Sequence, residues 1–290
     1  MISVIITTYK REMLILKRAI DTVWNQTYSD VELIIVNDYP PYIEKINQLI
    51  EKNYMGKRLF IIHNEANMGA CYSRNEGIKN ANGEYIAFLD DDDEWFPEKL
   101  SKQYAAISKN SNIAMVYCSG INVYSNGNKN EMSFIKDTCD TPLKNLLATN
   151  YIGGSSFPLI RKEVLCELNG FDTVLLSSQD YDLWIRIVSE YNIVFISEPL
   201  VLYYIMEDSI TSNPSKRIQG YNTLLRKHKV LYQRFPQSAI GIFKSIISVY
   251  VEHRYYNKVA YYLLKSFQYF PYNLSLLRFW SICLLKKLLL

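Results

Sequence analysis

The sequence predicts an α/β protein: a mostly parallel β-sheet flanked by helices, followed by a helical C-terminal region. Two observations carry this prediction. Over about the first 90 residues, short apolar runs alternate with longer segments of helical periodicity, which is the pattern of strands joined by crossover helices. From about residue 215 onward the pattern is helical only, so we divide the chain into domains at 1–214 and 215–290.

The first half contains four short runs of apolar and β-branched residues, which is typical of strands buried on both faces. They cover residues 2–6, 31–36, 59–62 and 85–89. Between them, apolar residues recur at helical spacing and predict three helices. These helices cover residues 12–25, 42–53 and 70–81, and Asn82-Gly83 supplies a stop signal for the last one.

The pattern after residue 98 is mixed. Short strands are expected at 114–117, 120–124, 157–160 and 193–196, and helices at 141–149 and 180–190. A loop of small residues, Gly153-Gly154-Ser155-Ser156, stands before the third of these strands. Glycines in such a loop also permit a substrate to approach the backbone closely.

Composition excludes several classes of protein. A hydrophobic fraction of 49% and a charged fraction of 21% are ordinary for a globular domain and argue against disorder. The five cysteines are widely spaced and form no CxxC pair, so neither a disulfide framework nor a structural zinc site is expected. The N-terminus, MISVIITTYKRE, lacks the features of a signal peptide. A reducing, cytoplasmic location fits these observations.

Charge is distributed unevenly along the chain. Residues 216–290 hold 13 Lys and Arg but a single acidic residue, Glu252, a net charge of +12, whereas the remainder carries −9. A basic, aromatic-rich tail predicts an anionic partner, and the alternative is that the tail packs on the acidic body.

Polar clusters follow three of the expected strands: Thr7–Tyr9, Asn37-Asp38 and Asp90–Asp93. Ligands of such sheets bind at the carboxyl ends of the strands, so a common site is expected there. Four adjacent aspartates repel one another unless a cation or water stabilises them, and carboxylate oxygens suit Mg²⁺ or Mn²⁺. In an extended segment, Asp90 and Asp92 would share one face and Asp91 and Asp93 the other. The alternative is a solvated acidic loop before a helix.

Six segments within about residues 2–205 form a series. They are ISVIITTYKR (2–11), WNQTYSDVELIIVND (24–38), NMGACYSRNEGI (67–78), GEYIAFLDDDDEWFPEKL (83–100), GGSSFPLIRKEVLCELNGFD (153–172) and SQDYDLWIRI (178–187). In this order they resemble the signatures of inverting family 2 glycosyltransferases of bacterial polysaccharide, O-antigen and capsule synthesis. The resemblance implies the GT-A fold, a nucleotide-sugar donor and a divalent cofactor, Mn²⁺ or Mg²⁺.

The resemblance also implies roles for individual residues on the donor side. Thr7 and Tyr9 match positions that hold the base, Tyr9 by stacking. Asp38 matches the carboxylate that accepts from the uracil N3–H, and Arg74 matches a basic position near the diphosphate. Thr7 and Tyr9 could instead simply end a strand, Asp38 could be a turn residue before Tyr-Pro-Pro, and Arg74 could serve only as an ion-pair partner.

Further roles follow for the acidic run and the acceptor side. Asp91 matches the residue near the ribose and Asp92 the direct metal ligand, while Asp90 supplies the first acid of the D-x-D pattern. Asp93 is left without a role. Asp180 matches the catalytic base, and its alternative is an acid at a helix N-terminus. Three residues lie in segments that resemble the acceptor and sugar side, namely Gly154, Ser155 and Gln179.

Two positions depart from the family pattern. Gln179 stands where Glu is frequent before the base, which puts the acceptor contacts in doubt, and Asn37 stands where Asp is frequent before Asp38. The base itself is retained. The predicted function is therefore metal-dependent, inverting transfer of a hexose or N-acetylhexosamine from a UDP-sugar to a hydroxyl of a glycan acceptor in cell-surface polysaccharide synthesis.

Two other functions were weighed against this one. A nucleotidyltransferase would need a glycine-rich phosphate loop after the first strand, and TTYKREMLIL has none. A non-catalytic glycan-binding or assembly subunit that keeps the fold remains an alternative, although retention of Asp38, Asp92 and Asp180 together argues against it.

The tail predicts peripheral attachment to a membrane. Leu274–Leu290 is apolar but shorter than the roughly 20 residues of a spanning helix, and it carries Arg278, Lys286 and Lys287. An interfacial helix on the inner face of the cytoplasmic membrane fits this pattern and would suit a lipid-linked acceptor. The alternative is packing on the domain or on a second subunit, as in a homodimer. Nucleic acid is not an expected partner, because apolar residues interleave with the basic ones.

Overall fold

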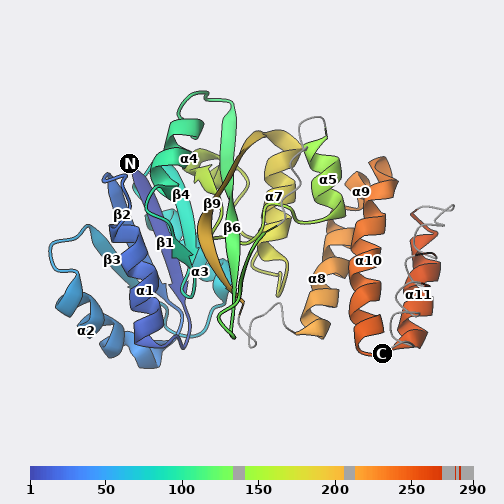
Figure 1. The fold of residues 1–290 in the computed structure, drawn as a ribbon, viewed down its shortest axis with the longest axis horizontal. Helices are drawn as coiled ribbons and strands as arrows, with labels where there is room; N and C mark the ends of the chain where they lie inside the picture. Colours follow the sequence, from blue (N-terminus) through green and yellow to red (C-terminus); the bar gives the residue numbers. More distant parts are fainter. Residues whose placement is uncertain (133–140, 206–212, 270–277, 279–280, 282–290) are drawn as a thin grey trace. The chain divides into compact units, whose positions relative to one another are not determined.

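The computed structural model describes residues 1–132, 141–205, 213–269, 278 and 281 (Figure 1). Two compact units are present. The first comprises Met1–Lys136, Ile152–Val174 and Asp180–Met206, and the second comprises Asp137–Tyr151, Leu175–Gln179 and Glu207–Leu290. The domain boundary expected between residues 214 and 215 stays a prediction, because it concerns where an independently folding domain ends.

The first unit is built on one mixed sheet, to which the described residues contribute nine strands in the order β3-β2-β1-β4-β8-β6-β9-β5, with β7 paired to β6. The parallel part contains β1 (Ile2–Thr8), β2 (Val31–Asn37), β3 (Leu59–His63) and β4 (Tyr85–Asp90). The other strands are β5 (Glu94–Trp95), β6 (Ile113–Tyr124), β7 (Lys129–Glu131), β8 (Leu159–Arg161) and β9 (Asn192–Ile205). The expected α/β class is confirmed.

The helices of the first unit lie on both faces of the sheet. They are α1 (Met13–Trp24), α2 (Ile43–Asn53), α3 (Ala70–Asn80), α4 (Lys99–Ile107), α6 (Lys162–Glu167) and α7 (Gln179–Glu190). Along β1, Val4 and Ile6 belong to the buried cluster that includes Leu16 of α1. Ile5 points the other way, where a Cβ on Gly77 of α3 would lie 2.5 Å from its Cγ2 atom. Because β1 is covered on both sides, its sequence is apolar throughout rather than alternating.

Strands β6 and β9 are longer than their sequences predict. Residues 114–117 and 120–124 belong to one continuous strand, and β9 extends from Asn192 to Ile205 instead of ending at residue 196. Ser119-Gly120 resembles a break in the sequence, but these residues lie at two register shifts between β6 and β9, where the irregular pairing accommodates extra residues of β9. A Cβ at Gly120 would lie 2.7 Å from the Phe157 ring, which explains the small residue.

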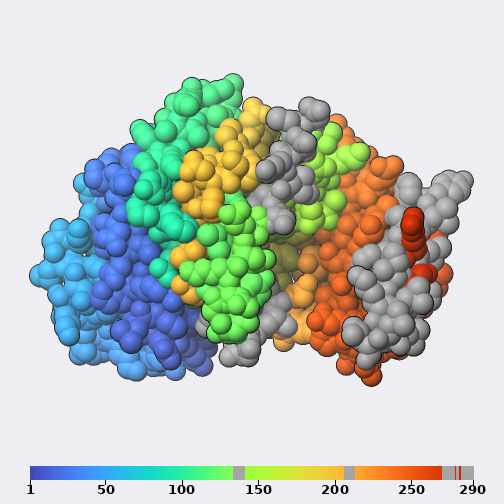
Figure 2. Space-filling view, viewed as in Figure 1, coloured from blue at the N-terminus to red at the C-terminus, as the bar shows by residue number. Residues whose placement is uncertain are grey.

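The remaining elements of the first unit are short. Strand β8 begins two residues later than the expected 157–160, and β5, β7 and α6 were not expected at all. The tip of the β6–β7 hairpin lies at the surface (green in Figure 2), and all three residues of β7 are exposed. Strands of two or three residues carry too little periodicity to be detected from a sequence.

The second unit, where the structure describes it, consists of helices, as expected from residue 215 onward. They are α5 (Pro142–Ala148), α8 (Pro214–Lys227), α9 (Lys229–Arg234), α10 (Pro236–Glu252) and α11 (Tyr256–Ser266). Helix α10 is apolar and buried around most of its circumference, which makes it the core of this unit.

The expected interfacial helix Leu274–Leu290 lies outside the described residues, apart from Arg278 and Ser281. Within the part of the chain that the structure covers, none of the helices combines the length and the apolar character that crossing a membrane requires.

Candidate functional site

Parallel pairing brings the three polar clusters to one edge of the sheet. Thr7 of β1 lies opposite Asp90 of β4, and Thr8 lies opposite Asn37 of β2. The N–H of Asp38 then donates to the carbonyl of Thr8 at 2.9 Å. The carboxyl ends of β1, β2 and β4 therefore present their polar residues together, as is general for ligand sites of parallel sheets.

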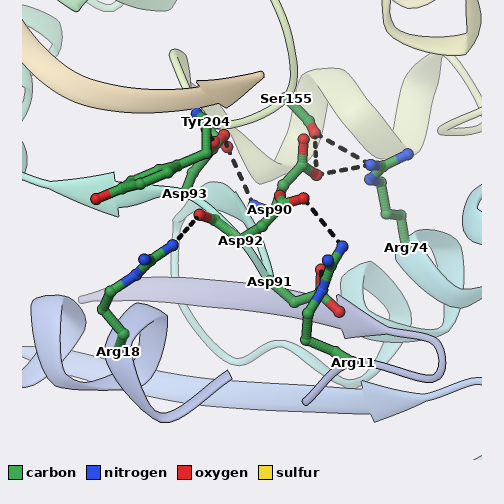
Figure 3. A network of polar contacts seen from close by, with 10 residues as sticks. Arg11, Arg18, Arg74, Asp90, Asp91, Asp92, Asp93, Ser155 and Tyr204 are labelled. Carbon is green, nitrogen blue, oxygen red and sulfur yellow. Dashed lines mark hydrogen bonds and ion pairs between the residues drawn. The ribbon is translucent and has the colours of Figure 1, made fainter. Parts of the chain in front are cut away.

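The acidic run is a turn and not an extended segment. The N–H of Asp93 donates to the carbonyl of Asp90 at 3.1 Å. Arg11 bonds two consecutive aspartates, its Nε to Asp91 Oδ1 at 2.8 Å and its terminal nitrogen to Asp92 Oδ2 at 2.9 Å (Figure 3). The expectation that Asp91 and Asp92 face opposite sides was therefore wrong, because the turn rotates the two side chains toward one guanidinium.

A second arginine supports the same turn from helix α1. Arg18 donates to the backbone carbonyl of Asp92 at 2.7 Å and pairs with Glu94 at 3.1 Å. Its guanidinium lies 3.9 Å from the centroid of the Tyr204 ring, a cation–π contact. Arg18 thus fixes the backbone of the acidic run, whereas Arg11 occupies its carboxylates.

The other side of the run faces Arg74. Asp90 Oδ1 accepts from Arg74 at 2.9 Å and from the Ser155 hydroxyl at 2.8 Å, and Arg74 also contacts Ser155 Oγ at 3.1 Å (Figure 3). A Cβ on the neighbouring Gly154 would lie 3.8 Å from Asp180 Oδ2. The structure therefore brings together Arg74, Asp90, Gly154 and Ser155, and Asp180 lies near Gly154 in the first turn of helix α7.

Asp93, which had no expected role, is fully buried beneath the run. Its Oδ2 accepts from the Ser156 hydroxyl at 2.6 Å and its Oδ1 from the N–H of Tyr204 in β9 at 3.0 Å. Ser156 Oγ in turn accepts from the N–H of Asp90 at 3.0 Å, and the Ser156 carbonyl accepts from the indole of Trp95 at 2.9 Å. Asp93 and Ser156 therefore fasten the turn to β9 and to the Gly-Ser loop.

Aromatic residues gather at the ends of β1 and β2. Tyr9 is 43% exposed and its ring meets that of Tyr39 edge to face at 5.4 Å. Lys10 Nζ lies 5.2 and 5.1 Å from the centroids of these two rings. Thr7, beside them, is half-buried. An exposed tyrosine ring at a strand end can stack on a planar base, so the geometry is compatible with the role implied for Tyr9.

Asp38 is buried and has three partners within the fold. It accepts from Asn64 Nδ2 at 2.7 Å and from the N–H groups of Met68 and Gly69 at 2.8 Å each. These bonds tie the loop before α3 to the end of β2. The structure thereby gives Asp38 a loop-organising function, and its recognition of uracil stays a prediction.

Gln179 belongs to the second unit, in contrast to Asp180. Its amide donates to the carbonyl of Leu175 at 2.9 Å, within that unit. The contact of Gln179 with the acceptor, implied by the family resemblance, stays a prediction.

Burial and mutual repulsion shape the electrostatics of the site. Burial, then the charges of Asp90 and Asp91, raise the pKa of Asp92 to about 6 against the opposing effect of Arg11. Burial also raises the pKa of Asp91, which Arg11 and the Thr8 hydroxyl partly offset. The pKa of Asp180 is raised by burial, with the Tyr181 N–H and Arg74 opposing the shift. The run therefore holds more negative charge than its arginines neutralise, which favours a cation.

The donor set fits a hard divalent cation. Among the described residues, no three His, Cys, Asp or Glu side chains converge on one point. Mg²⁺ is characteristically bound through one or two carboxylates, with substrate phosphates and water completing its shell. The Asp92 side chain is 19% exposed and offers carboxylate oxygens at the edge of the site, which suits such a partial shell.

Four residues of this network were missed in the sequence. The role of Arg11 could have been found from the sequence, because this residue closely follows the Thr7–Tyr9 cluster at the end of the first strand. A basic residue there is expected to face the acidic run at the end of a neighbouring strand. Arg18, Ser156 and Tyr204 had no such signal, because their roles depend on contacts between segments more than 60 residues apart in the chain.

Comparison with known proteins identifies the family of this chain. Residues 3–168 match the domain described as glycosyl transferase family 2. A putative colanic acid biosynthesis glycosyl transferase, WcaA of Escherichia coli K12, is 36% identical over 244 residues, covering 81% of this chain and 83% of that protein. The E. coli UDP-Glc:alpha-D-GlcNAc-diphosphoundecaprenol beta-1,3-glucosyltransferase WfgD is 30% identical over 224 residues, 76% of this chain and 83% of WfgD.

Solved structures share the fold at low sequence identity. Residues 1–349 of Staphylococcus aureus TarS in complex with UDP-GlcNAc superpose with a TM-score of 0.62 at 18% identity, covering 86% of this chain and 81% of that one. The mannosyltransferase PcManGT of Pyrobaculum calidifontis, in complex with GDP-Man and Mn²⁺, gives 0.60 at 15% identity, covering 99% and 86%.

Proposed function

This chain belongs to glycosyl transferase family 2 and has the GT-A fold, and from that premise we propose that it catalyses metal-dependent, inverting transfer of a hexose or N-acetylhexosamine from a UDP-sugar to a glycan hydroxyl. Membership makes it a glycosyltransferase of the kind found in bacterial polysaccharide synthesis. The nucleotide, the stereochemistry, the metal and the acceptor are the proposed part.

One observation carries the proposal. Arg74 interacts with two carboxylates that the family resemblance assigns to opposite halves of the reaction: it bonds Asp90 of the acidic run at 2.9 Å, and its charge opposes the rise that burial causes in the pKa of Asp180. A basic group between a donor-side and an acceptor-side carboxylate is the arrangement that a displacement at the anomeric carbon requires, since negative charge leaves on one side and a proton is lost on the other.

The residues of this chain divide the chemistry as follows. Tyr9 stacks on the base, and Arg74 stabilises negative charge on the diphosphate as the sugar departs. Asp180 accepts the proton of the attacking hydroxyl, which is a poor nucleophile until the proton is removed. A divalent ion held by Asp92, with Asp90 beside it, supplies Lewis-acid stabilisation of the leaving group when bound. Attack from the Asp180 side, opposite the nucleotide, inverts the anomeric configuration.

The donor and acceptor classes are supported by the names of similar proteins. WfgD is named for a UDP-glucose donor and a lipid diphosphate acceptor, and TarS was solved with UDP-GlcNAc. We therefore propose a UDP-hexose or UDP-N-acetylhexosamine donor and a lipid-linked acceptor. The basic C-terminal region would then hold the protein peripherally at the inner face of the cytoplasmic membrane, where such acceptors are anchored.

The test is a donor screen with the full chain. UDP-glucose, UDP-galactose and UDP-GlcNAc are each incubated with Mn²⁺ and a lipid-diphosphate-linked sugar, and released UDP and the product anomer are measured. We expect UDP release with one donor, dependence on acceptor and metal, and a product of inverted configuration. UDP release that persists after chelation would contradict the metal dependence, and a retained configuration would contradict the Asp180 mechanism. Glycan binding without turnover of any donor would favour the non-catalytic subunit.

A further inference from the structure

One guanidinium bonds two carboxylates of the acidic run, that of Asp92, the proposed metal ligand, and that of its neighbour Asp91. Arg11 reaches Asp91 Oδ1 through Nε at 2.8 Å and Asp92 Oδ2 through a terminal nitrogen at 2.9 Å. Both distances are those of charge-assisted hydrogen bonds. The pair is also partly shielded from water, with Asp91 buried and Asp92 only 19% exposed. Arg11 is thus the direct counter-ion of the residue proposed to bind the metal.

A metal ion and this guanidinium compete for the same oxygen. A divalent ion held by the Asp92 carboxylate would add a second positive group to the carboxylate that Arg11 already bonds at 2.9 Å, in a site screened only in part by water. Metal binding therefore requires Arg11 to withdraw, unless another anion compensates the added charge.

Arg11 lies in a connecting segment, where its side chain can move more easily than that of Arg18 on helix α1. It lies in the connection between β1, which ends at Thr8, and α1, which begins at Met13. The preceding Lys10 has a φ of 55°, a left-handed conformation that is uncommon for a residue with a side chain. Arg18 is fixed on a helix and bonds the backbone carbonyl of Asp92, so it leaves the carboxylate to other ligands.

The diphosphate of the bound donor is the alternative partner expected for the Arg11 guanidinium. Tyr9, the proposed base-stacking residue, is two positions away, and Arg11 bonds the carboxylates at the adjoining strand end. A bound nucleotide diphosphate therefore brings two negative groups within the reach of a long, flexible side chain. Arginine binds phosphate oxygens with the same fork that it presents to carboxylates.

We propose that Arg11 is an internal counter-ion that offsets part of the negative charge of Asp91 and Asp92 in the empty enzyme and releases Asp92 to the divalent cation when the donor diphosphate arrives. Metal and nucleotide then bind with positive coupling, and each raises the affinity for the other by the same factor. This inference rests on the proposed function, because it takes Asp92 as the metal ligand.

Mn²⁺ binding to the full chain tests the inference without turnover. Free Mn²⁺ is measured by its electron paramagnetic resonance signal, with and without UDP, for the wild type and Arg11→Gln. In the wild type we expect UDP to tighten Mn²⁺ binding by about tenfold, within the usual range of coupling between sites. In Arg11→Gln we expect Mn²⁺ to bind about tenfold more tightly without UDP, and UDP to tighten Mn²⁺ binding by a smaller factor than in the wild type.

Two matched variants separate competition from general charge. Arg18→Gln removes one positive charge beside the run but none from its carboxylates, so Mn²⁺ affinity should change much less. Arg58→Gln removes an arginine that pairs with Asp30 at 3.1 Å, next to the start of β3, and should bind Mn²⁺ like the wild type. Arg11→Lys keeps the positive charge but loses the two-pronged geometry of the guanidinium, so its affinity for Mn²⁺ should lie between those of the wild type and Arg11→Gln. It serves as the test if Arg11→Gln fails to fold.

The outcomes distinguish this inference from the proposed function. If UDP strengthens Mn²⁺ binding to the wild type but Arg11→Gln binds Mn²⁺ no more tightly than wild type without UDP, the counter-ion role is wrong and the metal site stands. If Arg18→Gln has as large an effect as Arg11→Gln, general electrostatics explains the result and the inference is again overturned. Absence of Mn²⁺ binding with UDP, or unchanged binding in Asp92→Asn, overturns the metal site and this inference with it.

Discussion

Asp180 is the residue whose ionisation should set the acidic limit of activity. Burial raises its pKa above the ordinary value for aspartate, while the charge of Arg74 lowers it and the charge of Asp90 raises it. As a base it works only when ionised, so kcat/KM should fall as pH drops through this raised pKa. Arg74→Gln removes the opposing charge and should move the acidic limb to higher pH.

The pH profile of kcat/KM for wild type and Arg74→Gln measures that shift. Asp180→Asn should lower kcat by about 10²- to 10⁴-fold, the usual contribution of a positioned general base, while UDP binding is retained. An acidic limb at the same pH in both proteins would contradict the influence of Arg74. Normal turnover by Asp180→Asn would exclude it as the base.

Ser156 is the residue on which the shape of the acidic turn depends most directly. Its hydroxyl accepts from the Asp90 N–H and donates to the buried Asp93 carboxylate. Ser156→Ala would leave both groups without that partner, at a cost of about 1–3 kcal/mol in the free energy of unfolding. Urea denaturation measures the change, with Ser101→Ala as control because Ser101 pairs with Thr27 at the surface. Equal stability of the two variants would mean that water replaces the Ser156 hydroxyl without loss.

At the scale of elements, helix α4 carries a fully buried lysine. Lys99 Nζ donates to Gln103 Oε1 at 2.8 Å and lies 4.0 Å from the centroid of the Trp95 ring, and burial lowers its pKa to about 8. Between this value and the ordinary pKa near 10.5, the unfolded chain binds a proton that the folded chain does not. The contribution of Lys99 to stability must therefore rise with pH across that interval.

Lys99→Met isolates this effect. The stability difference between wild type and variant should shift in favour of the wild type by about 3 kcal/mol from pH 8 to pH 10.5, at 1.36 kcal/mol for each unit of pKa shift. Urea denaturation at several pH values measures both proteins, and subtraction removes the titration of other groups. A difference that stays constant with pH would show that Lys99 keeps its ordinary pKa.

Helix α10 packs so closely on α5 that one methyl group should disrupt the contact. A Cβ on Gly241 would lie 1.9 Å from the carbonyl oxygen of Ala148, which is backbone and cannot rotate away. Gly241→Ala should therefore destabilise the second unit by about 1–3 kcal/mol, despite the higher helix propensity of alanine. Thermal unfolding compares it with Ser248→Ala at an exposed position of the same helix, which should match or exceed wild-type stability.

Elements of the parallel half were predictable because their signals are local. Apolar runs marked β1 to β4, and helical spacing marked α1 to α3, each within a few residues of the observed ends. The continuity of β6 across Ser119-Gly120 was not predictable, since it depends on pairing with a strand about 80 residues away. The turn conformation of the acidic run was not predictable for the same reason, because Arg11 and Ser156, which bond it, lie in distant segments of the chain.

At the scale of the whole molecule, the chain is electrically asymmetric, with a net charge of −9 over residues 1–215 and +12 over residues 216–290. The excess does not reside mainly in the apolar C-terminal segment. Residues 213–269 hold ten Lys and Arg and one acidic residue, Glu252. Residues 274–290 form an apolar segment with only three basic residues. For the proposed membrane attachment, electrostatic attraction would therefore come mainly from residues 213–269, and insertion of apolar residues from residues 274–290.

Truncation after residue 273 should separate these two contributions. The shortened chain keeps most of the positive charge, so it should still bind vesicles of phosphatidylglycerol at low salt. Its binding should be lost near 0.15 M salt, where charges separated by more than about 8 Å are screened. The full chain should remain bound at that salt concentration, because burial of apolar residues at the interface is not screened. Co-sedimentation with vesicles at both salt concentrations measures this difference, with neutral phosphatidylcholine vesicles as control. If the truncated and full chains respond identically to salt, Leu274–Leu290 does not insert, and packing on the protein itself becomes the better explanation of its apolar residues.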